Sequence, residues 1–211
     1  MSDLFNLFAY TPGCQNMKYM KAKAYIIERL QNELSPNLFY HGVHHTLDVF
    51  NAVVFLAYSE KIRGDDLLLL YTAALYHDAG FLKQYQNNEH IAVLLAEEML
   101  PQFNYNKDQI KVVSDIILST IIPQHPHTHL EKIMCDADLD YLGSDDFFVI
   151  SQTLKKEWLI YGVIESEDQW NSIQIHFLEQ HHYFTNTAIK TRAFKKEKHL
   201  ESIKNLRKNN N

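Results

Sequence analysis

The sequence predicts an all-α fold, a bundle of helices around an apolar core. Apolar residues recur at helical spacing in several segments, and the prolines fall between those segments instead of inside them. No segment alternates apolar and polar residues in the way that a half-buried strand does, and only 6 glycines occur in 211 residues, which suits a bundle better than a β-rich fold. The apolar fraction of 46% and the charged fraction of 22% are those of an ordinary globular protein.

Three segments carry the clearest helical pattern. Leu47, Phe50, Val54 and Ala57 recur at i, i+3, i+7 and i+10, and the residues around them are also apolar, so we expect a helix that begins near Thr46 and is buried on most sides. The pattern recurs in the segments 110–121 and 147–158. Further helices are predicted at about 17–34, 65–78, 89–100, 130–142, 167–184 and 188–208. Pro36, Pro101, Pro123 and Pro126 mark breaks between them.

The chain shows no linker, repeat or low-complexity tract apart from the basic tail Lys195–Asn211, so we predict one domain over residues 1–211. The net charge of −6 argues against a nucleic acid partner, because affinity for a duplex comes mostly from Lys and Arg on phosphates. A small phosphorylated substrate stays possible, because a metal can supply the missing positive charge.

Cysteine usage and apolar run length indicate a cytoplasmic protein without a membrane segment. Cys14 and Cys135 lie far apart and have no paired metal-ligand spacing, which favours neither a disulfide framework nor a cysteine zinc site. The N-terminal residues lack the basic segment of a signal peptide. The most apolar run, Leu67–Tyr76, is too short to cross a bilayer.

The placement of histidines and acids is the most informative feature. His77 and Asp78 directly follow the apolar run, and Gly80 is a plausible helix terminator. Burying an unpaired carboxylate there would be costly, and a divalent cation would remove that cost. Taken alone, however, a histidine and an aspartate at a helix end more often form a cap or a hydrogen-bonded pair than a metal site.

Two further segments supply ligands of the same kind. His45 stands at the N-terminus of the predicted helix that begins near Thr46. Asp136, Asp138 and Asp140 alternate in an otherwise apolar helix, and acids two residues apart on a helix point in well-separated directions. We take Asp138 as the residue that points inward, with Asp136 and Asp140 as capping, surface or supporting groups.

The order His45, His77-Asp78, Asp138 resembles the H…HD…D signature of the HD superfamily. The segments YHGVHHTLDV, AALYHDAGF and DADLDYLG are similar to the three motif regions of HD and phosphodiesterase-like (PDEase-like) domains, over about residues 39–143. The following segment, about 144–211, is a helical extension, and its stretches DDFFVISQTLKKEW and HHYFTNTAIKTRAFKK resemble bacterial proteins described as predicted metal-dependent HD phosphohydrolases.

This resemblance implies an HD-domain helical bundle in which His45, His77, Asp78 and Asp138 converge on a divalent metal ion. Two imidazoles and two carboxylates suit Mn, Fe, Co, Ni, Zn or Mg and do not choose among them. The implied reaction is hydrolysis of a phosphoester of a nucleotide or other small molecule by a metal-activated water. Asp78 would bridge the two ions if a second metal binds.

The resemblance also suggests two residues for proton transfer. His41 stands where phosphodiesterase-like relatives carry a histidine near the leaving-group oxygen, so it is a candidate general acid, or else a solvent-facing loop histidine. Glu89 stands where relatives often place an acid near the metal-bound water, so it is a candidate general base, or else a glutamate favoured by the helix dipole. His44 is more easily explained as a spectator.

Other candidates have a simpler interpretation as surface or core residues. His125, His127 and His129 come from a region that supplies ligands in two-metal HD proteins, but Pro126 interrupts the expected pair, and a surface loop near the site is favoured. A solvated basic helix is the preferred explanation of Arg192, Lys195 and Lys196, which together with His181, His182 and Tyr183 could otherwise line the entrance. Lys155 and Lys156 are assigned to the surface and Trp158 to the core.

Two alternatives to the hydrolase stay open. One is a di-iron oxygenase of the same fold, which would need further histidine ligands. The other is a regulatory module with a structural metal. The sequence does not identify the substrate or the oligomeric state.

Overall fold

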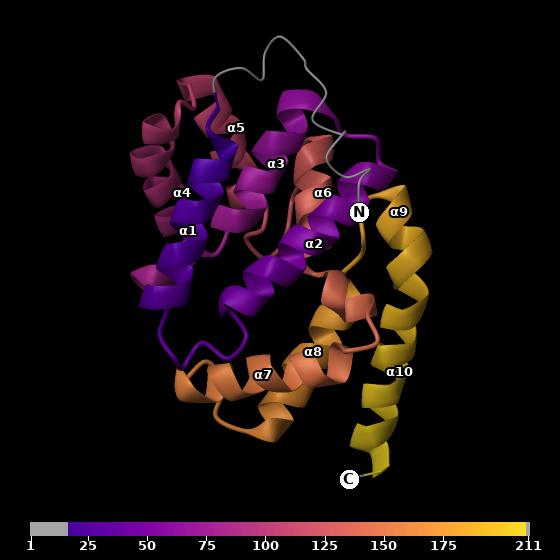
Figure 1. The fold of residues 1–211 in the computed structure, drawn as a ribbon. Coiled ribbons are helices and arrows are strands. Elements are labelled where there is room, and N and C mark those ends of the chain that lie inside the picture. The colour runs from indigo at the N-terminus through magenta and orange to yellow at the C-terminus, as the bar shows by residue number, and fades with distance from the viewer. Residues whose placement is uncertain (1–16, 210–211) are drawn as a thin grey trace.

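The computed structural model describes residues 17–209, and within that range it contains helices and no strand, which confirms the all-α prediction (Figure 1). Cys14 and the N-terminal residues considered for a signal peptide lie outside the described range. In chain order the helical elements are α1 (Tyr19–Glu33), α2 (Val43–Ser59), α3 (Gly64–Tyr76), η2 (Ala79–Leu82), α4 (Asn88–Met99), η3 (Leu100–Phe103), α5 (Lys107–Leu118), α6 (His129–Asp138), η4 (Asp140–Gly143), α7 (Phe147–Ile160), α8 (Glu167–Gln180), α9 (Asn186–Ala188), η5 (Ile189–Ala193) and α10 (Phe194–Asn209).

Two apolar clusters organise these elements. Helices α1 to α6 surround the larger one, whose centre includes the fully buried residues Ile26, Val53, Leu70 and Ile117. The smaller cluster joins η4, α7, α8 and α10 through residues such as Phe147, Leu178 and Leu200. Figure 1 shows α7 and α8 below the main bundle and α10 along its side. The larger core buries the apolar faces that the sequence pattern predicts, and α7 and α8 close one end of the bundle.

Local signals set several helix starts. Asn106 and Gln109 exchange side-chain and backbone hydrogen bonds at the start of α5, and Thr128 and Glu131 do the same at the start of α6. Each pair satisfies amide groups that have no partner within the helix. Pro123 and Pro126 lie in the segment between these two helices, where neither removes a helical hydrogen bond.

Gly80 does not terminate α3 in the way that the sequence suggested. The α-helix ends at Tyr76, and Gly80 lies inside the short 3₁₀ helix η2 without a left-handed backbone. Its role is to allow a close approach, because a Cβ atom on Gly80 would lie 1.8 Å from the carbonyl oxygen of Asn88. Gly80 therefore lets the start of α4 pack directly against η2, next to the His-Asp pair.

The predicted helix at 167–184 ends earlier, at Gln180. Asp136, which is fully buried, accepts hydrogen bonds from the backbone N–H groups of Phe184 and Thr185, both at 2.8 Å, and holds residues 181–185 outside the helix. Lys196 donates to the carbonyl oxygens of Leu178, at 3.0 Å, and His181. The prediction of a solvated basic helix is therefore wrong for Lys196, whose buried ammonium caps the end of α8.

Helix α7 also corrects one assignment. Trp158 was predicted to lie in the core, but it is partly exposed, and the fully buried residue is its neighbour Glu157. Of the two lysines of α7 that were assigned to the surface, Lys156 is exposed, whereas Lys155 is only partly exposed. Lys155 pairs with Glu167 at 2.8 Å, and the ammonium of Lys156 lies 3.5 Å from the ring centre of Phe39.

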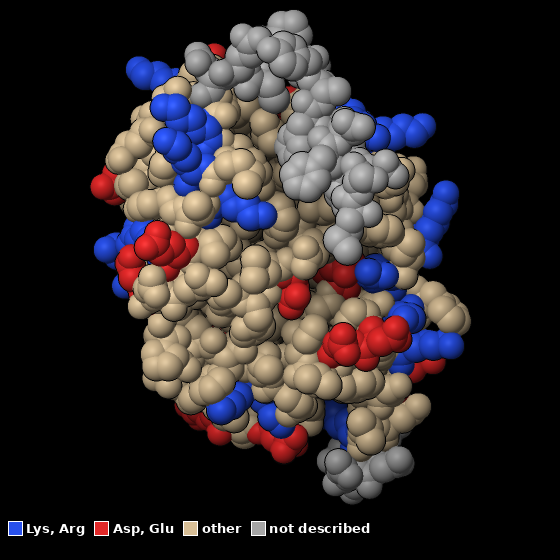
Figure 2. Space-filling model, in the orientation of Figure 1, with Lys and Arg blue, Asp and Glu red and all other residues tan. Residues whose placement is uncertain are grey.

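Among residues 17–209, no helix is both long enough and apolar enough to span a bilayer. On the face drawn in Figure 2, lysine and arginine side chains are interspersed with acidic ones and form no continuous basic stripe among the described residues.

Candidate metal centre

His77 and Asp78 sit at the buried end of α3. Residues 67–70 and 72–76 are all buried, and His77 continues the helix as its C-cap with 1% of its surface exposed. The ring Nδ1 of His77 lies 2.9 Å from the carbonyl oxygen of Ala74. A carbonyl can only accept, so Nδ1 carries the proton, and Nε2 of the neutral ring keeps the lone pair that a metal requires.

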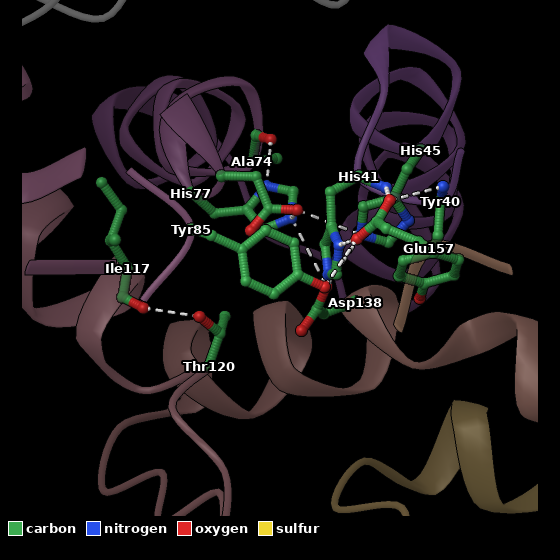
Figure 3. A network of polar contacts seen from close by, with 11 residues as sticks. Tyr40, His41, His45, Ala74, His77, Tyr85, Ile117, Thr120, Asp138 and Glu157 are labelled. Atoms are coloured by element: carbon green, nitrogen blue, oxygen red, sulfur yellow. Dashed lines mark hydrogen bonds and ion pairs between the residues drawn. The ribbon is translucent and has the colours of Figure 1, made fainter. Parts of the chain in front are cut away.

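Four side-chain atoms from three parts of the chain converge at this point. His45 comes from the first turn of α2, His77 and Asp78 follow α3, and Asp138 is the last residue of α6. Oδ2 of Asp78 lies 3.4 Å from Nε2 of His45 and 3.2 Å from Nε2 of His77. Oδ1 of Asp138 lies 3.3 Å and 3.4 Å from the same two nitrogens. Figure 3 shows His45, His77 and Asp138 pointing toward one another from their separate helices.

These distances fit a metal ion. Two atoms bound at right angles to one ion lie about 3 Å apart when each bond is about 2.1 Å long. The atoms of His45, His77 and Asp138 all lie within 4.8 Å of one another, and Asp78 adds a fourth oxygen between the imidazoles. Nε2 of His77 and Oδ2 of Asp78 are also buried without a hydrogen-bond partner. A cation at this point would satisfy both atoms.

The electrostatics of the cluster favour charged carboxylates. Burial would raise the pKa values of Asp78 and Asp138, but the neighbouring histidines outweigh burial and lower both. Burial would likewise lower the pKa of His77, but the charges and hydrogen bonds of Asp78 and Asp138 raise it well above its ordinary value. The strong negative potential of the two carboxylates is the property that attracts a divalent cation.

The three alternating acids of the α6 region take separate roles. Asp138 faces the two histidines, Asp136 holds the backbone at Phe184 and Thr185, and Asp140 accepts a hydrogen bond from Nε of Arg192 at 2.8 Å. This division agrees with the expectation that only Asp138 points to the metal, with Asp136 and Asp140 as capping and supporting groups.

His41 lies beside the cluster and is held by a buried carboxylate. Its Nδ1 is 2.5 Å from Oε1 of Glu157 (Figure 3). Its ring stacks on Phe81, with the ring centres 4.3 Å apart. The backbone N–H of His41 also donates to Glu157, at 3.1 Å. Burial would lower the pKa of His41, but the hydrogen bond to Glu157 and the charge of Asp78 raise it. His41 is thus a partly buried, oriented histidine and not a solvent-facing one.

Glu157 was not recognised from the sequence. It accepts hydrogen bonds from the backbone N–H of Tyr40 and the hydroxyl of Tyr85 in addition to those from His41. Burial would raise the pKa of Glu157, but the hydrogen bond and charge of the His41 ring, followed by the backbone N–H groups of Tyr40 and His41, lower it. One signal was present, because Glu157 lies three residues after Leu154, in phase with the apolar stripe of α7. A carboxylate in such a stripe requires a partner.

Glu89 and Asn88 stand at the start of α4, on the wall of a cavity that also contains His41 and Asp78. Burial raises the pKa of Glu89, and the charges of Asp78 and Asp138 raise it further. Asn88 is 8% exposed, and its Oδ1 is buried without a partner. No motif in the sequence points to Asn88.

The remaining histidines lie apart from the cluster. His44 is exposed, as expected of a spectator. His125, His127 and His129 are exposed too, and the Nε2 of His129 lies 3.4 Å from Glu60. His125 and His127 border a separate cavity of 750 Å³ together with His181 and His182.

Two cavities meet at the candidate ligands, and Tyr40, His45, Asp138 and Tyr141 line both. The first, of 510 Å³, is here named the acidic cavity, because its wall includes Asp48, Asp140 and Asp146 along with Arg192. The second, of 350 Å³, is named the aromatic cavity and lies between the main bundle and helices α7 and α8. It is lined by His41, Asp78 and Glu89 on one side and by Trp158, Trp170, Gln174 and Phe177 on the other.

Comparison with known proteins agrees with this geometry. The family model described as "HD domain" matches residues 42–140. An uncharacterized protein of Clostridium beijerinckii is 30% identical over 81 residues, which make up 37% of this chain and only 51% of that relative. The fold is similar to the crystal structure of a predicted HD superfamily hydrolase from an uncultured Thermotogales bacterium, with a TM-score of 0.58 and 20% identity over 91% of this chain and 92% of the other.

His45, His77, Asp78 and Asp138 all lie within the matched region, in the order H…HD…D, and they converge at one point of an all-α fold. The family model and the fold therefore support an HD domain in this chain, matched over residues 42–140.

Proposed function

We propose that this protein is a metal-dependent phosphohydrolase that cleaves the phosphoester of a nucleotide or other small molecule. The observation that carries the proposal is the group formed by His45, His77, Asp78 and Asp138, in which each imidazole Nε2 lies 3.2–3.4 Å from an oxygen of both carboxylates. The oriented pair His41 and Glu157 lies beside this group. The similarity to a structure described as a predicted HD superfamily hydrolase supports hydrolysis.

The four residues would hold a divalent metal of the Mn, Fe, Co, Ni, Zn or Mg group, because two imidazole nitrogens and two carboxylate oxygens suit all of these ions. Such a metal, when bound, polarises a phosphoryl oxygen and lowers the pKa of a coordinated water. The role of the chain is to keep both carboxylates charged and both imidazoles correctly oriented, as the Ala74 carbonyl does for His77.

His41 supplies the proton for the leaving-group oxygen. Glu157 accepts from Nδ1, which leaves Nε2 as the free donor of the protonated ring. The raised pKa of His41 keeps a larger fraction of the ring protonated near neutral pH, as a general acid requires. Without Glu157 the ring could rotate, and its proton would no longer have a fixed direction.

Glu89 is the general base, which accepts a proton from the attacking water, whereas His41 protonates the leaving group. It shares the aromatic cavity with His41 and Asp78. Its raised pKa, caused first by burial, brings a glutamate closer to the neutral range in which a general base works best.

The positions of the other histidines favour the hydrolase over the di-iron oxygenase. The oxygenase would need extra histidine ligands, and the candidates His125, His127 and His129 are exposed. The regulatory module with a structural metal is less well supported, because a purely structural site would have no need of His41 and Glu157 beside two cavities.

Metal analysis of the purified protein, combined with a screen of nucleotides and phosphoesters for phosphate release, tests the proposal. We expect about one divalent metal per chain and metal-dependent turnover. Asp78→Asn should lose both, because it replaces a charged ligand by a neutral amide. Asp115→Asn is the matched control, since Asp115 is exposed and pairs only with Lys111 on the surface of α5. Full activity in Asp78→Asn, or no hydrolysis of any phosphoester by metal-loaded protein, would refute the proposal.

A further inference from the structure

We propose that the substrate carries a single phosphoryl group joined to a flat aromatic group, and that the aromatic cavity binds this aromatic group. The inference rests on the proposed function, because it takes the candidate metal residues as the place where the phosphoryl group binds. It concerns the chemical class of the substrate, which the metal residues alone do not determine.

The first observation is the shape and chemistry of the cavity wall. Trp158 and Trp170 form an edge-to-face pair, with ring centres 5.6 Å apart and an angle of 83° between the rings, and Phe177 lies on the same wall. The volume of 350 Å³ lies within the range of small-molecule sites. Aromatic walls of this kind stack on flat rings, and every nucleobase or aryl group has a suitable face.

The second observation is a buried hydrogen-bond acceptor that has no partner. Oδ1 of Asn88 is buried in this wall and has no partner, although only 8% of the residue is exposed. A buried acceptor without a donor destabilises the protein unless a ligand or water supplies one. The partly buried Gln174 adds a side chain that can both donate and accept. Both residues suit a ring or ring substituent with N–H or O–H groups.

The third observation is the balance of charge. No lysine or arginine lines the aromatic cavity in the described part of the chain, whereas Asp78, Asp138 and Glu89 do. Arg192 lines the neighbouring acidic cavity, but its Nε is bonded to Asp140 at 2.8 Å. A metal ion and the protonated His41 would supply direct cationic contacts for one phosphoryl group only. Each further phosphate would add negative charge near carboxylates with no free cation beside it.

Together these observations favour an aromatic phosphomonoester over a polyphosphate or an aliphatic phosphate. Both a nucleoside monophosphate and a simple aryl phosphate have a single phosphoryl group and a flat ring, but only the nucleobase also offers hydrogen-bonding groups. They differ in hydrogen-bonding groups on the ring, so Gln174 provides the means to tell them apart.

Intrinsic fluorescence tests the inference directly, because the chain has only 2 tryptophans and both line the aromatic cavity. Manganese-loaded protein is mixed rapidly with adenosine 5′-monophosphate, adenosine 5′-triphosphate, phenyl phosphate or glycerol phosphate at constant free Mn²⁺, and the initial quenching is recorded. We expect the monophosphate to quench and to bind at least about tenfold more tightly than the triphosphate or glycerol phosphate.

Two variants locate the effect. Trp158→Leu should weaken binding of both aromatic ligands about tenfold while binding of glycerol phosphate is unchanged, and Trp170 remains as the reporter. Trp158 is partly exposed, so the variant should fold, which circular dichroism checks. Gln174→Ala should weaken the nucleoside monophosphate alone if the nucleobase is recognised. No loss with either aromatic ligand would instead favour a simple aryl group, whereas an equal loss with both would mean that Gln174 does not contact ring hydrogen-bonding groups. Gln152→Ala, on the exposed side of α7, is the control.

The inference is overturned if the triphosphate or glycerol phosphate binds as tightly as the monophosphate, or if Trp158→Leu leaves all affinities unchanged. These outcomes differ from failure of the proposed function. If the monophosphate quenches and is selected as expected but no phosphate is released under any metal, the hydrolase is wrong and the binding site stands.

Discussion

A single buried carboxylate, that of Glu157, determines the orientation and protonation of the His41 ring. Glu157 accepts hydrogen bonds from the N–H groups of Tyr40 and His41, from the His41 ring and from the hydroxyl of Tyr85, at 2.8, 3.1, 2.5 and 3.0 Å. These donors replace the water that the charged group loses on burial. Glu157 thereby fixes the tautomer, the ring orientation and the protonation range of His41 at the same time.

Glu157→Gln should separate orientation from protonation. The amide can still accept from Nδ1 but carries no charge, so the pKa of His41, which Glu157 raises, should fall. Asp78 and Asp138 still face the ring, so the shift should be limited to about one pH unit. A general acid works only while it is protonated, and the alkaline limb of kcat/KM should therefore move to lower pH.

The pH-rate profiles of metal-loaded wild-type and Glu157→Gln protein measure this shift. Glu201→Gln, on the exposed face of α10, is the control and should leave the limb in place. The His41→Ala variant should still bind the metal, and its pH-rate profile should no longer show the alkaline fall in kcat/KM that is assigned to His41. An alkaline limb that is identical in wild type and Glu157→Gln would mean that His41 is not the acid.

At the scale of elements, η2 and the start of α4 depend on the absence of one side chain. Gly80→Ala would place Cβ 1.8 Å from the Asn88 carbonyl, so backbone must move, and we expect a loss of about 1–3 kcal/mol. The same shift displaces Asn88 and Glu89, so turnover should fall further than stability alone explains. Gly162→Ala is the comparison, because no atom lies within 4 Å and only its φ of +69° resists an alanine. Denaturant unfolding and kcat for both variants test this, and equal turnover in the two would contradict it.

The segment after α8 has its own pH dependence. Burial, followed by the charge of Lys196, lowers the pKa of His181 from 6.5 to about 3. The unfolded chain therefore binds a proton that the folded chain rejects between these values, and stability is lost as pH falls below about 6.5. His181→Phe keeps the ring packed on Phe177 and should remove about 1 kcal/mol of the loss between pH 7 and pH 5.5.

Urea unfolding at the two pH values measures the effect on His181. His182→Phe changes the exposed neighbour and should retain the wild-type pH dependence. If His181→Phe and wild type lose stability equally on acidification, His181 is not a source of the acid sensitivity.

Helices were predictable as elements, but several of their ends were not. The apolar period places α2, α5 and α7 from local sequence alone. The end of α8 at Gln180 depends on Asp136, 48 residues from Phe184, and on Lys196, which caps the helix from α10. Likewise, Glu157 is buried in place of Trp158 because His41 supplies a hydrogen-bond partner for its carboxylate. His41 lies 116 residues away in the sequence, so local sequence does not reveal this pair. Contacts between residues so far apart in the sequence do not appear in the pattern of apolar residues along a helix.

At the scale of the whole molecule, the candidate ligands join α2, the end of α3 and the end of α6. A metal that binds only the folded chain stabilises it by mass action, by about 2.7 kcal/mol at a free concentration 100 times the dissociation constant. Chelation should therefore lower the melting temperature, and added Mn²⁺ should restore it. Differential scanning calorimetry checks both steps. The melting temperature of the Asp78→Asn variant should change with neither treatment. If the chelator leaves the melting temperature of the wild-type protein unchanged, this would count against a bound metal.

The candidate site was only partly predictable for the same reason. His45, His77, Asp78 and Asp138 could be found because the family motif keeps them in order and in recognisable local sequence. Asn88 and the cavity wall at Trp158 and Trp170 have no such motif. They become functional candidates only when α7 and α8 fold back across the end of the bundle.

This fold-back separates two kinds of information along the chain. The four candidate ligands lie within residues 42–140, whereas Trp158, Trp170 and Gln174 lie beyond that stretch on α7 and α8. In the proposed hydrolase, replacement of α8 would change the groups that contact the organic part of the substrate, while the four candidate ligands stay in place. Transplanting residues 167–180 between relatives, with Glu157 kept on α7 to hold His41, is the corresponding route for redesigning specificity.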